Sequence, residues 1–271
     1  MTTEQEYVLG TADTEIRRLG LQHAVWRSDA TEAWRAAGFR PGNVIIDVGC
    51  GPGFATFDLA EIVAPGGRVY AIDQSARFID YAECQARARG LQNVVAATAD
   101  LDAFEFDGIV ADGAWIRWVL AFVHQPRRVL SRLASALRPA ARIAIHEYFA
   151  YEAWKLLPRD NDFERFVVSV MQSWRSRGGE PNIGLNLVTW LEEMGFRIRS
   201  TRTITNLIRA NDPRWHWPTA FALSGVDRLM ELGDVDFAEA ERLRTRLRSL
   251  LSEDAWMFTP AVLEVIAEWP A

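Results

Sequence analysis

The sequence is poor in lysine, in cysteine and in long apolar runs, and each shortage excludes a class of protein. Lys155 is the only lysine among 271 residues and the formal net charge is −6, so there is no basic field for a nucleic-acid backbone. Two cysteines, Cys50 and Cys84, make neither a disulfide framework nor a zinc site. No apolar run reaches the roughly 18 residues of a membrane span, and no signal peptide is recognisable. We therefore expect a cytoplasmic protein without nucleic-acid, membrane or metal partners.

What the chain does contain is the composition of a folded α/β protein. Hydrophobic residues make up 49% of the sequence, which is typical of a globular protein with a large core. The length suffices for one large α/β domain with insertions. Apolar runs and helical patterns predict three parts. These are an N-terminal helical cover at 1–40, an α/β core at 41–150, and a remainder at 151–271 with helical insertions at about 151–180 and 207–258.

The stretch at residues 44–54 predicts a strand, a tight turn and the start of a helix. Its apolar part, VIIDV, suits a central parallel strand that is buried on both faces. Gly49, Gly51 and Gly53 then permit positive φ and let a ligand approach the backbone. The first turn of the following helix presents free N–H groups, which suit a polar or anionic ligand group.

The spacing of the three glycines excludes two common nucleotide sites. A dinucleotide fingerprint needs a small residue where this chain has Phe54. A phosphate-cradling loop needs a lysine after its last glycine, whereas no lysine or arginine follows Gly53 until Arg68. Asp47, at the end of the strand, adds a carboxylate that repels a pyrophosphate and attracts an ammonium or sulfonium group.

Two further acids are predicted at the same edge of the sheet. A second strand, 68–73, ends in Asp73, and a third, 93–98, is followed by Asp100. Ligands of open α/β sheets bind outside the carboxyl ends of the strands, so both acids should converge with Asp47. The alternative is an α/β turn that needs glycine for shape alone, with each acid in solvent. The ordered combination favours a ligand site.

This combination resembles motif I and the following acids of the class I S-adenosylmethionine-dependent methyltransferases of small-molecule type, over about residues 40–150. The resemblance implies a Rossmann-like, seven-stranded, mostly parallel sheet with helices on both faces, plus the N-terminal helical cover and helical lid insertions. It implies S-adenosyl-L-methionine as the cofactor, with Asp73 on the ribose and Asp100 near the adenine. The cofactor-binding residues that it implies are Tyr7, Gln22, Asp47, Gly49, Cys50, Gly51, Gly53, Asp73, Gln74, Asp100, Leu101, Ile116 and Arg117.

Aromatic residues in the variable second half are the candidates for binding the methyl acceptor. Indole faces attract flat or cationic groups, although a tryptophan on a helix more often packs in the core. The alternation of Trp215 and Trp217 in a proline-bounded loop favours a functional role. The proposed acceptor-binding residues are Trp118, His124, Tyr148, Trp174, Trp215 and Trp217.

The catalytic candidates are His146 and Glu147, which end the fifth predicted strand at the cofactor's edge. Successive strand residues point to opposite faces, so only one of them can readily face the pocket. We favour His146, because a neutral imidazole takes a proton near neutral pH. His124 and His23 are the alternative bases. The other interpretation is that His146 or Glu147 only hydrogen-bonds a neighbouring loop.

The sequence therefore predicts methyl transfer to a small, largely apolar or aromatic metabolite, with the N, O, S or C acceptor atom undetermined. In-line displacement at a sulfonium methyl depends mainly on orientation and exclusion of water. Methylation of a protein side chain is one alternative. A catalytically inactive regulatory protein that binds S-adenosylmethionine is the other, because intact acids predict binding and not turnover.

Overall fold

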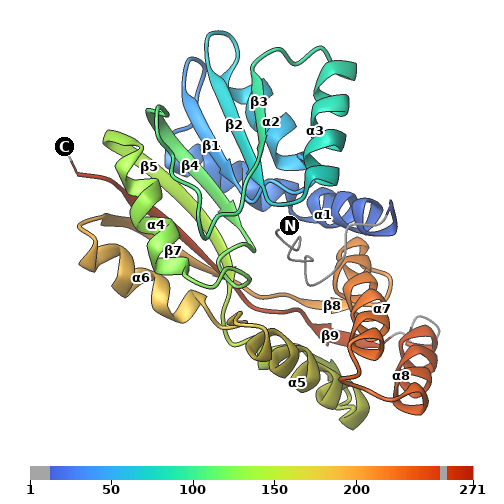
Figure 1. Ribbon diagram of the computed structural model, residues 1–271. Helices are drawn as coiled ribbons and strands as arrows, with labels where there is room; N and C mark the ends of the chain where they lie inside the picture. Colours follow the sequence, from blue (N-terminus) through green and yellow to red (C-terminus); the bar gives the residue numbers. More distant parts are fainter. Residues whose placement is uncertain (1–12, 251–254, 271) are drawn as a thin grey trace.

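The computed structural model describes residues 13–250 and 255–270, and a seven-stranded sheet lies at its centre (Figure 1). The strand order is β3-β2-β1-β4-β5-β10-β7, and only β10 runs antiparallel to its neighbours. The strands are β1 (Val44–Val48), β2 (Arg68–Asp73), β3 (Val94–Thr98), β4 (Ala111–Arg117), β5 (Leu137–Tyr148), β7 (Arg197–Ile204) and β10 (Val262–Glu268). The expected seven-stranded, mostly parallel sheet is confirmed.

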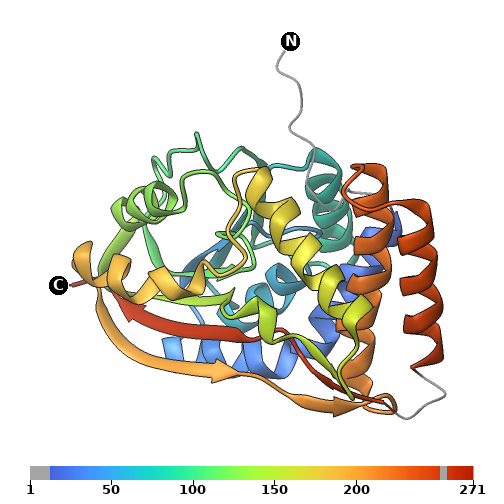
Figure 2. The same ribbon diagram turned by 90° about the horizontal axis from the view of Figure 1, so that it is seen from below.

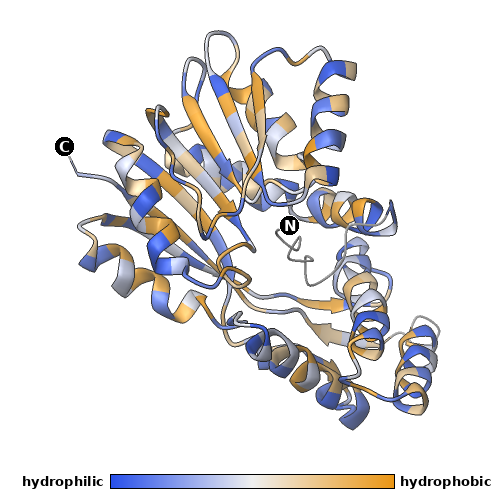
Figure 3. Ribbon diagram, viewed as in Figure 1, coloured by the Kyte–Doolittle hydropathy of each residue, from blue (hydrophilic) through white to orange (hydrophobic). Residues whose placement is uncertain are grey.

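Helices cover both faces of this sheet because its strands carry apolar side chains on both sides. Ile46 and Val48 belong to the same buried cluster as α4 (Pro126–Ser135) and α6 (Gly184–Glu193). Ile45, which points the other way, packs with α1 (Asp13–Ala37) and α2 (Phe54–Val63), and α3 (Ala76–Ala88) lies on that face as well. Figure 3 shows the strands as apolar and the outer helix surfaces as polar.

A second, three-stranded antiparallel sheet continues the large one beyond its carboxyl edge. Its strands are β6 (Lys155–Leu157), β9 (Trp256–Phe258) and β8 (Leu207–Arg209), in the order β6-β9-β8. Along the chain, β6 follows β5, β9 precedes β10 and β8 follows β7. The small sheet therefore has the same strand order as β5-β10-β7 at the edge of the large sheet (Figure 2). The expected helical insertions at about 151–180 and 207–258 therefore contain short strands as well as helices.

Three helices accompany the small sheet: α5 (Asn161–Ser176), α7 (His216–Glu231) and α8 (Phe237–Ser249). The α5 helix begins where the Asp160 carboxylate accepts a hydrogen bond from the backbone N–H of Phe163, and Asp236 caps α8 in the same way. The α7 helix packs between α1 and α5, which joins the N-terminal cover to the inserted helices (Figure 1). None of the helices within 13–250 and 255–270 combines the length and apolarity that crossing a membrane requires.

We predict that Trp154→Ala lowers the free energy of unfolding by about 3–5 kcal/mol. Trp154 is 0% exposed, its Nε1 donates to Met257 Sδ at 3.2 Å, and it packs edge-on against Phe163. Denaturant unfolding measures the loss. Trp256→Ala is the control, since Trp256 lies in the same small sheet but is 38% exposed, and it should cost about 1 kcal/mol. Equal losses in the two variants would contradict the tight packing of this region.

Candidate active site

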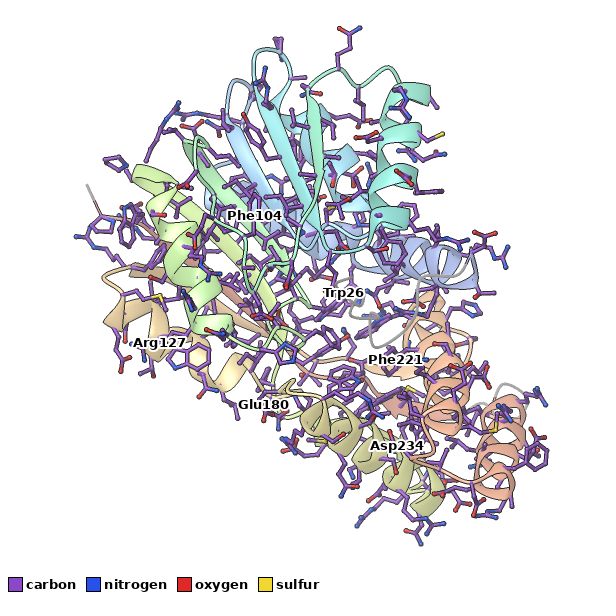
Figure 4. The ribbon with its side chains drawn as sticks, viewed as in Figure 1. Trp26, Phe104, Arg127, Glu180, Phe221 and Asp234 are labelled. Atoms are coloured by element: carbon purple, nitrogen blue, oxygen red, sulfur yellow. The ribbon has the colours of Figure 1, made fainter. Side chains whose placement is uncertain are left out.

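One cavity of about 320 Å³ opens at the carboxyl ends of the strands. The ends of β1 and β2 and the loop after β3 contribute carboxylates, whereas the turn after β4 and the helices α5 and α7 contribute aromatic side chains. Gly51, Trp174 and Phe221 thus line a single space although they come from distant parts of the chain (Figure 4, in which Phe221 is labelled).

The glycine turn needs its glycines for two different reasons. Gly49 has φ 64°, and a Cβ there would lie 2.3 Å from Val119 Cγ2, so close packing excludes a side chain. Gly51 has φ 54°, and a Cβ there would meet nothing within 4 Å. Both positive φ values favour glycine, and the space beside Gly51 is open to a ligand.

Asp47 is buried in the wall of the cavity, and Asp73 is half-buried there. Asp47 is 2% exposed and accepts a hydrogen bond from Thr56 Oγ1 at 2.6 Å, and burial raises its pKa to about 7. Asp73 accepts hydrogen bonds from the backbone N–H groups of Gly51 (2.8 Å) and Ser75 (2.9 Å). Burial raises the pKa of Asp73, and these hydrogen bonds oppose the shift. Asp73 thereby ties the end of β2 to the glycine turn.

Arg117, at the end of β4, brings a buried positive charge to the same wall. Its Nη1 is buried and has no hydrogen-bond partner among the described residues, and burial lowers its pKa to about 10. Neither Arg117 nor Asp47 has an ion-pair partner within 13–250 and 255–270. Asp47 and Arg117 attract each other although they form no contact ion pair, and together they complement a zwitterion, such as an α-amino acid group.

His23 of α1 holds Arg117 in place. His23 Nδ1 lies 3.1 Å from Arg117 Nη2, and its Nε2 lies 3.0 Å from the Asp58 carboxylate, which Arg27 also binds. A guanidinium only donates, so Nδ1 accepts from Arg117 and the Nε2–H donates to Asp58. This assignment requires a neutral imidazole, and burial lowers the pKa of His23 accordingly.

The turn after β4 forms the wall shared by the acidic and aromatic parts of the cavity. Trp118 has φ 53°, a left-handed conformation that is uncommon for a bulky residue. Its ring stacks on Tyr148 with centroids 5.3 Å apart. The backbone N–H groups of Val119 and Leu120 both donate to Glu147 Oε1 at 2.7 Å. Glu147 therefore holds the turn that presents Trp118 to the cavity.

The structure brings most of the proposed residues to this cavity, though not all of them. The ones that line it are Gln22, Asp47, Gly49, Cys50, Gly51, Asp73, Gln74, Asp100, Leu101, Arg117, Trp118, His124, Tyr148 and Trp174. Those that do not line it are Gly53, Ile116, His146, Glu147, Trp215 and Trp217. Tyr7 lies outside the described residues.

His146 and Glu147 are fully buried behind the cavity wall, so the geometry does not support either as the catalytic base. His146 points toward α1, where its ring packs against Trp115 and its Nε2 lies 2.8 Å from Glu264 Oε2. Glu147 points the opposite way and binds the turn after β4. Strand alternation separated the two residues as expected, but neither direction leads into the cavity.

The two tryptophans of the Trp215–Trp217 segment are core residues. Trp215 is 0% and Trp217 is 3% exposed. Trp217 stacks on Trp118 at 5.8 Å and donates from Nε1 to Gln22 Oε1 at 3.2 Å. Trp217 therefore supports the cavity wall from behind.

Sequence reasoning missed several residues of the cavity wall. They are Arg18, Leu19, Phe54, Asp102, Trp115, Phe122, Val123, Arg177 and Phe221. In the sequence analysis, Phe54 was used only to exclude a dinucleotide site. The residues on helices, such as Arg18, Leu19 and Phe221, belong to amphipathic patterns, and such a pattern does not show whether a side chain faces a pocket or the core. Within the described ranges no cluster of three or more His, Cys, Asp or Glu residues is arranged to hold a metal ion.

The parallel sheet, the glycine turn and its acids define a Rossmann-like nucleotide-cofactor fold. A family model described as a methyltransferase domain matches residues 39–179, about half of the chain. The chain therefore belongs to the methyltransferase domain family, in the class I S-adenosylmethionine-dependent group.

Individual relatives agree with this assignment. An uncharacterised 37.1 kDa protein of transposon TN4556 from Streptomyces fradiae is 33% identical over 63% of this chain and 48% of its own length. The 2-phytyl-1,4-naphtoquinone methyltransferase of Nostoc punctiforme is 31% identical over 47% of this chain and 54% of its own. The chain thus spans about half the length of these curated relatives. The geranyl diphosphate C-methyltransferase of Streptomyces coelicolor shares the fold, with a TM-score of 0.56 and 13% identity over 91% of this chain and 80% of that one.

We predict that stability depends on pH through Glu147. Burial raises its pKa from 4.5 to about 8, so the folded protein binds this proton more tightly than the unfolded chain does. The free energy of unfolding should therefore fall, relative to that of Glu147→Gln, as the pH rises from about 5 to about 8. Denaturant unfolding of both proteins across this range measures the difference. Glu193→Gln, at an exposed ion pair, is the control, and a difference for Glu147→Gln that does not change with pH would refute the prediction.

Proposed function

We propose that this chain transfers the methyl group of S-adenosylmethionine to a small, largely apolar or aromatic metabolite. The observation that carries the proposal is the single cavity that joins the glycine turn and its acids to an aromatic wall. An enclosed site of this kind accommodates a small molecule beside the cofactor more readily than an extended protein segment.

The cofactor part of the proposal is supported by the charged groups at the ends of the strands. Asp47 and Arg117 offer opposite buried charges to the amino and carboxylate groups of the methionine moiety. The open space beside Gly51 accommodates close approach to the backbone. Asp73 and Asp100, at the ends of the next two strands, are assigned to the ribose and the adenine.

The acceptor part is supported by a continuous set of aromatic contacts. Tyr148 stacks on Trp118 and contacts Trp174 at 6.3 Å, and Trp174 meets Phe122 at 4.6 Å and Phe221 at 6.1 Å. These rings offer apolar faces to a flat molecule. The Nostoc relative that methylates a naphthoquinone fits an acceptor of this shape.

The chain's own residues contribute mainly orientation and exclusion of water. S-adenosylmethionine supplies a sulfonium methyl group: an electron pair of the acceptor forms the new bond to carbon, and the carbon–sulfur pair returns to sulfur. Both ring nitrogens of His23 are engaged, whereas His124 binds Asp102 through Nδ1 at 3.1 Å and its Nε2 has no partner among the described residues. His124 is therefore the candidate base where the acceptor must lose a proton.

A screen for S-adenosylhomocysteine formation against amine, phenol and thiol libraries tests the proposed function. Turnover with small flat acceptors and none with peptides is the expected result. Turnover with peptides alone would favour methylation of a protein side chain. Cofactor binding without turnover on any acceptor would favour a regulatory protein.

We predict that Asp73→Ala weakens S-adenosylmethionine binding by about 10- to 150-fold, because charge-assisted hydrogen bonds are worth about 1.5–3 kcal/mol. Calorimetry without added metal measures the dissociation constant. Asp80→Ala is the control, since Asp80 is exposed on α3 and does not line the cavity. Unchanged affinity in Asp73→Ala, or tighter binding of NAD, would overturn the cofactor assignment.

We predict that substituting His124 slows methyl transfer and that substituting His146 does not, for an acceptor that must lose a proton. His124→Gln should lower the rate at saturating acceptor by about a hundredfold or more, because a general base contributes that much. His146→Gln should stay within about threefold of the parent, since His146 does not line the cavity. Rates measured across pH, at a temperature where both variants remain folded, decide. The reverse ranking would restore His146 as the base.

A further inference from the structure

Apart from Arg117 at the end of β4, the charged residues of the cavity wall are acidic at the strand ends and basic on the helices. Every lining carboxylate, namely Asp47, Asp73, Asp100 and Asp102, comes from the ends of β1 and β2 or the loop after β3. The helices α1 and α5 contribute arginines instead, Arg18 from within α1 and Arg177 immediately after α5. Arg18 and Arg177 thus bring positive charge to the wall that carries the aromatic side chains, and Asp102, which binds His124, is the nearby carboxylate.

Arg177 is held by one end of its guanidinium. Its Nη1 donates to the backbone oxygen of Ser173 (2.9 Å), to Ser173 Oγ (2.7 Å) and to Asp234 Oδ2 (3.1 Å). The hydrogen bonds that hold Arg177 within the described residues all run through Nη1, which leaves Nε and Nη2 for a ligand. Asp234, labelled in Figure 4, follows α7 and does not line the cavity. Of this ion pair, only Arg177 lines the cavity.

Arg18, on α1, also lines the cavity, but all three of its guanidinium nitrogens donate hydrogen bonds within the protein. It forms a bidentate pair with Glu15, donates to Gln22 Oε1, and lies 5.6 Å from the centre of the Phe221 ring. Glu15 does not line the cavity, whereas Arg18 does. Two guanidinium groups therefore face the acceptor region with their carboxylate partners behind them.

Trp118 supplies an independent sign that the ligand carries an acceptor atom. The residue is only 8% exposed, lines the cavity, and its Nε1–H has no hydrogen-bond partner among the described residues. A buried N–H without a partner is costly. In the part of the chain that the structure describes, Trp26, Trp34 and Trp215 carry one as well, but Trp118 is the one of these four that lines the cavity, where a ligand oxygen would satisfy it. Oxygen is the atom that an indole N–H and a guanidinium both bind.

We propose that the methyl acceptor is a flat aromatic anion, a ring system that carries a carboxylate or another ionised oxygen. This inference rests on the proposed function and specifies its substrate class. The rings of Trp118, Tyr148, Trp174 and Phe221 hold the aromatic part, Arg177 binds the anionic group, and Arg18 adds a second positive charge to the wall. Aromatic faces alone would also accept a cation, but the two guanidinium groups repel one.

Three probes of matched shape test the charge preference: cinnamate, cinnamamide and cinnamylammonium. Calorimetry first measures S-adenosylhomocysteine binding to the full chain and then binding of each probe to the loaded protein. Cinnamate should bind about tenfold or more tightly than cinnamamide, and cinnamylammonium should bind most weakly. The preference should shrink as salt is added, because screening weakens attraction between partly exposed charges.

Arg177→Gln and Arg175→Gln form a matched pair of variants. Arg175 lies on the same last turn of α5, pairs with Glu180 (labelled in Figure 4) and does not line the cavity. Arg177→Gln should remove the preference for cinnamate and leave cinnamamide binding and thermal stability near those of the parent. Arg175→Gln should keep the preference.

Each outcome bears on one conclusion. Failure of S-adenosylhomocysteine to bind overturns the proposed function itself. Normal binding of S-adenosylhomocysteine, with cinnamate no tighter than cinnamamide or with no cinnamate binding at all, overturns the anionic acceptor alone. Equal effects of Arg177→Gln and Arg175→Gln overturn the assignment to Arg177.

Discussion

The contact between Gly49 and Val119 sets the spacing between the two parts of the cavity. A side chain at Gly49 would overlap Val119, so the glycine turn and the turn after β4 fit together in only one way. Glu147 fixes the second turn by accepting two backbone hydrogen bonds from it, and Trp118 takes a left-handed conformation there. The turn after β4 carries Trp118 and contacts the glycine turn. A displacement of this turn would therefore change both the site proposed for the methionine group and the aromatic wall. Strain of this kind persists only where its surroundings hold it firmly.

Buried charge is the second feature on which the site depends. Asp47 and Arg117 both carry pKa values displaced by burial, and neither has an ion-pair partner among the described residues. The two groups attract each other, and a bound zwitterion would place an opposite charge beside each of them. The His23–Asp58 pair adds rigidity, because it leaves Arg117 one orientation. The N-terminal helix therefore takes part in the site as well as covering it.

The sequence predicted the features whose signals are local and missed those that depend on tertiary contacts. The strand at 44–48, the glycine turn and the acids at strand ends follow from hydrophobic pattern and turn chemistry, and the structure places all three acids on one cavity. The strands β6, β8 and β9 have three residues each, too few for a periodicity of two to appear. Arg177 and Phe221 were missed because the sequence does not reveal which side of an amphipathic helix faces an opening. His146 was expected to face the pocket but does not line the cavity. Strand alternation shows that His146 and Glu147 point to opposite faces, but it does not show which face leads to a ligand.

The small sheet has a consequence for how acceptor specificity can diversify. Because β8 and β9 pair antiparallel, the segment from β8 through α7 and α8 to β9 leaves and re-enters the fold at neighbouring points. Such a segment can be exchanged for one of another length or sequence while β7 and β10 keep their register. Phe221 and the Asp234 partner of Arg177 would change with it, and the glycine turn would not. The residues at the strand ends and those of the exchangeable segment therefore line one cavity but can vary separately.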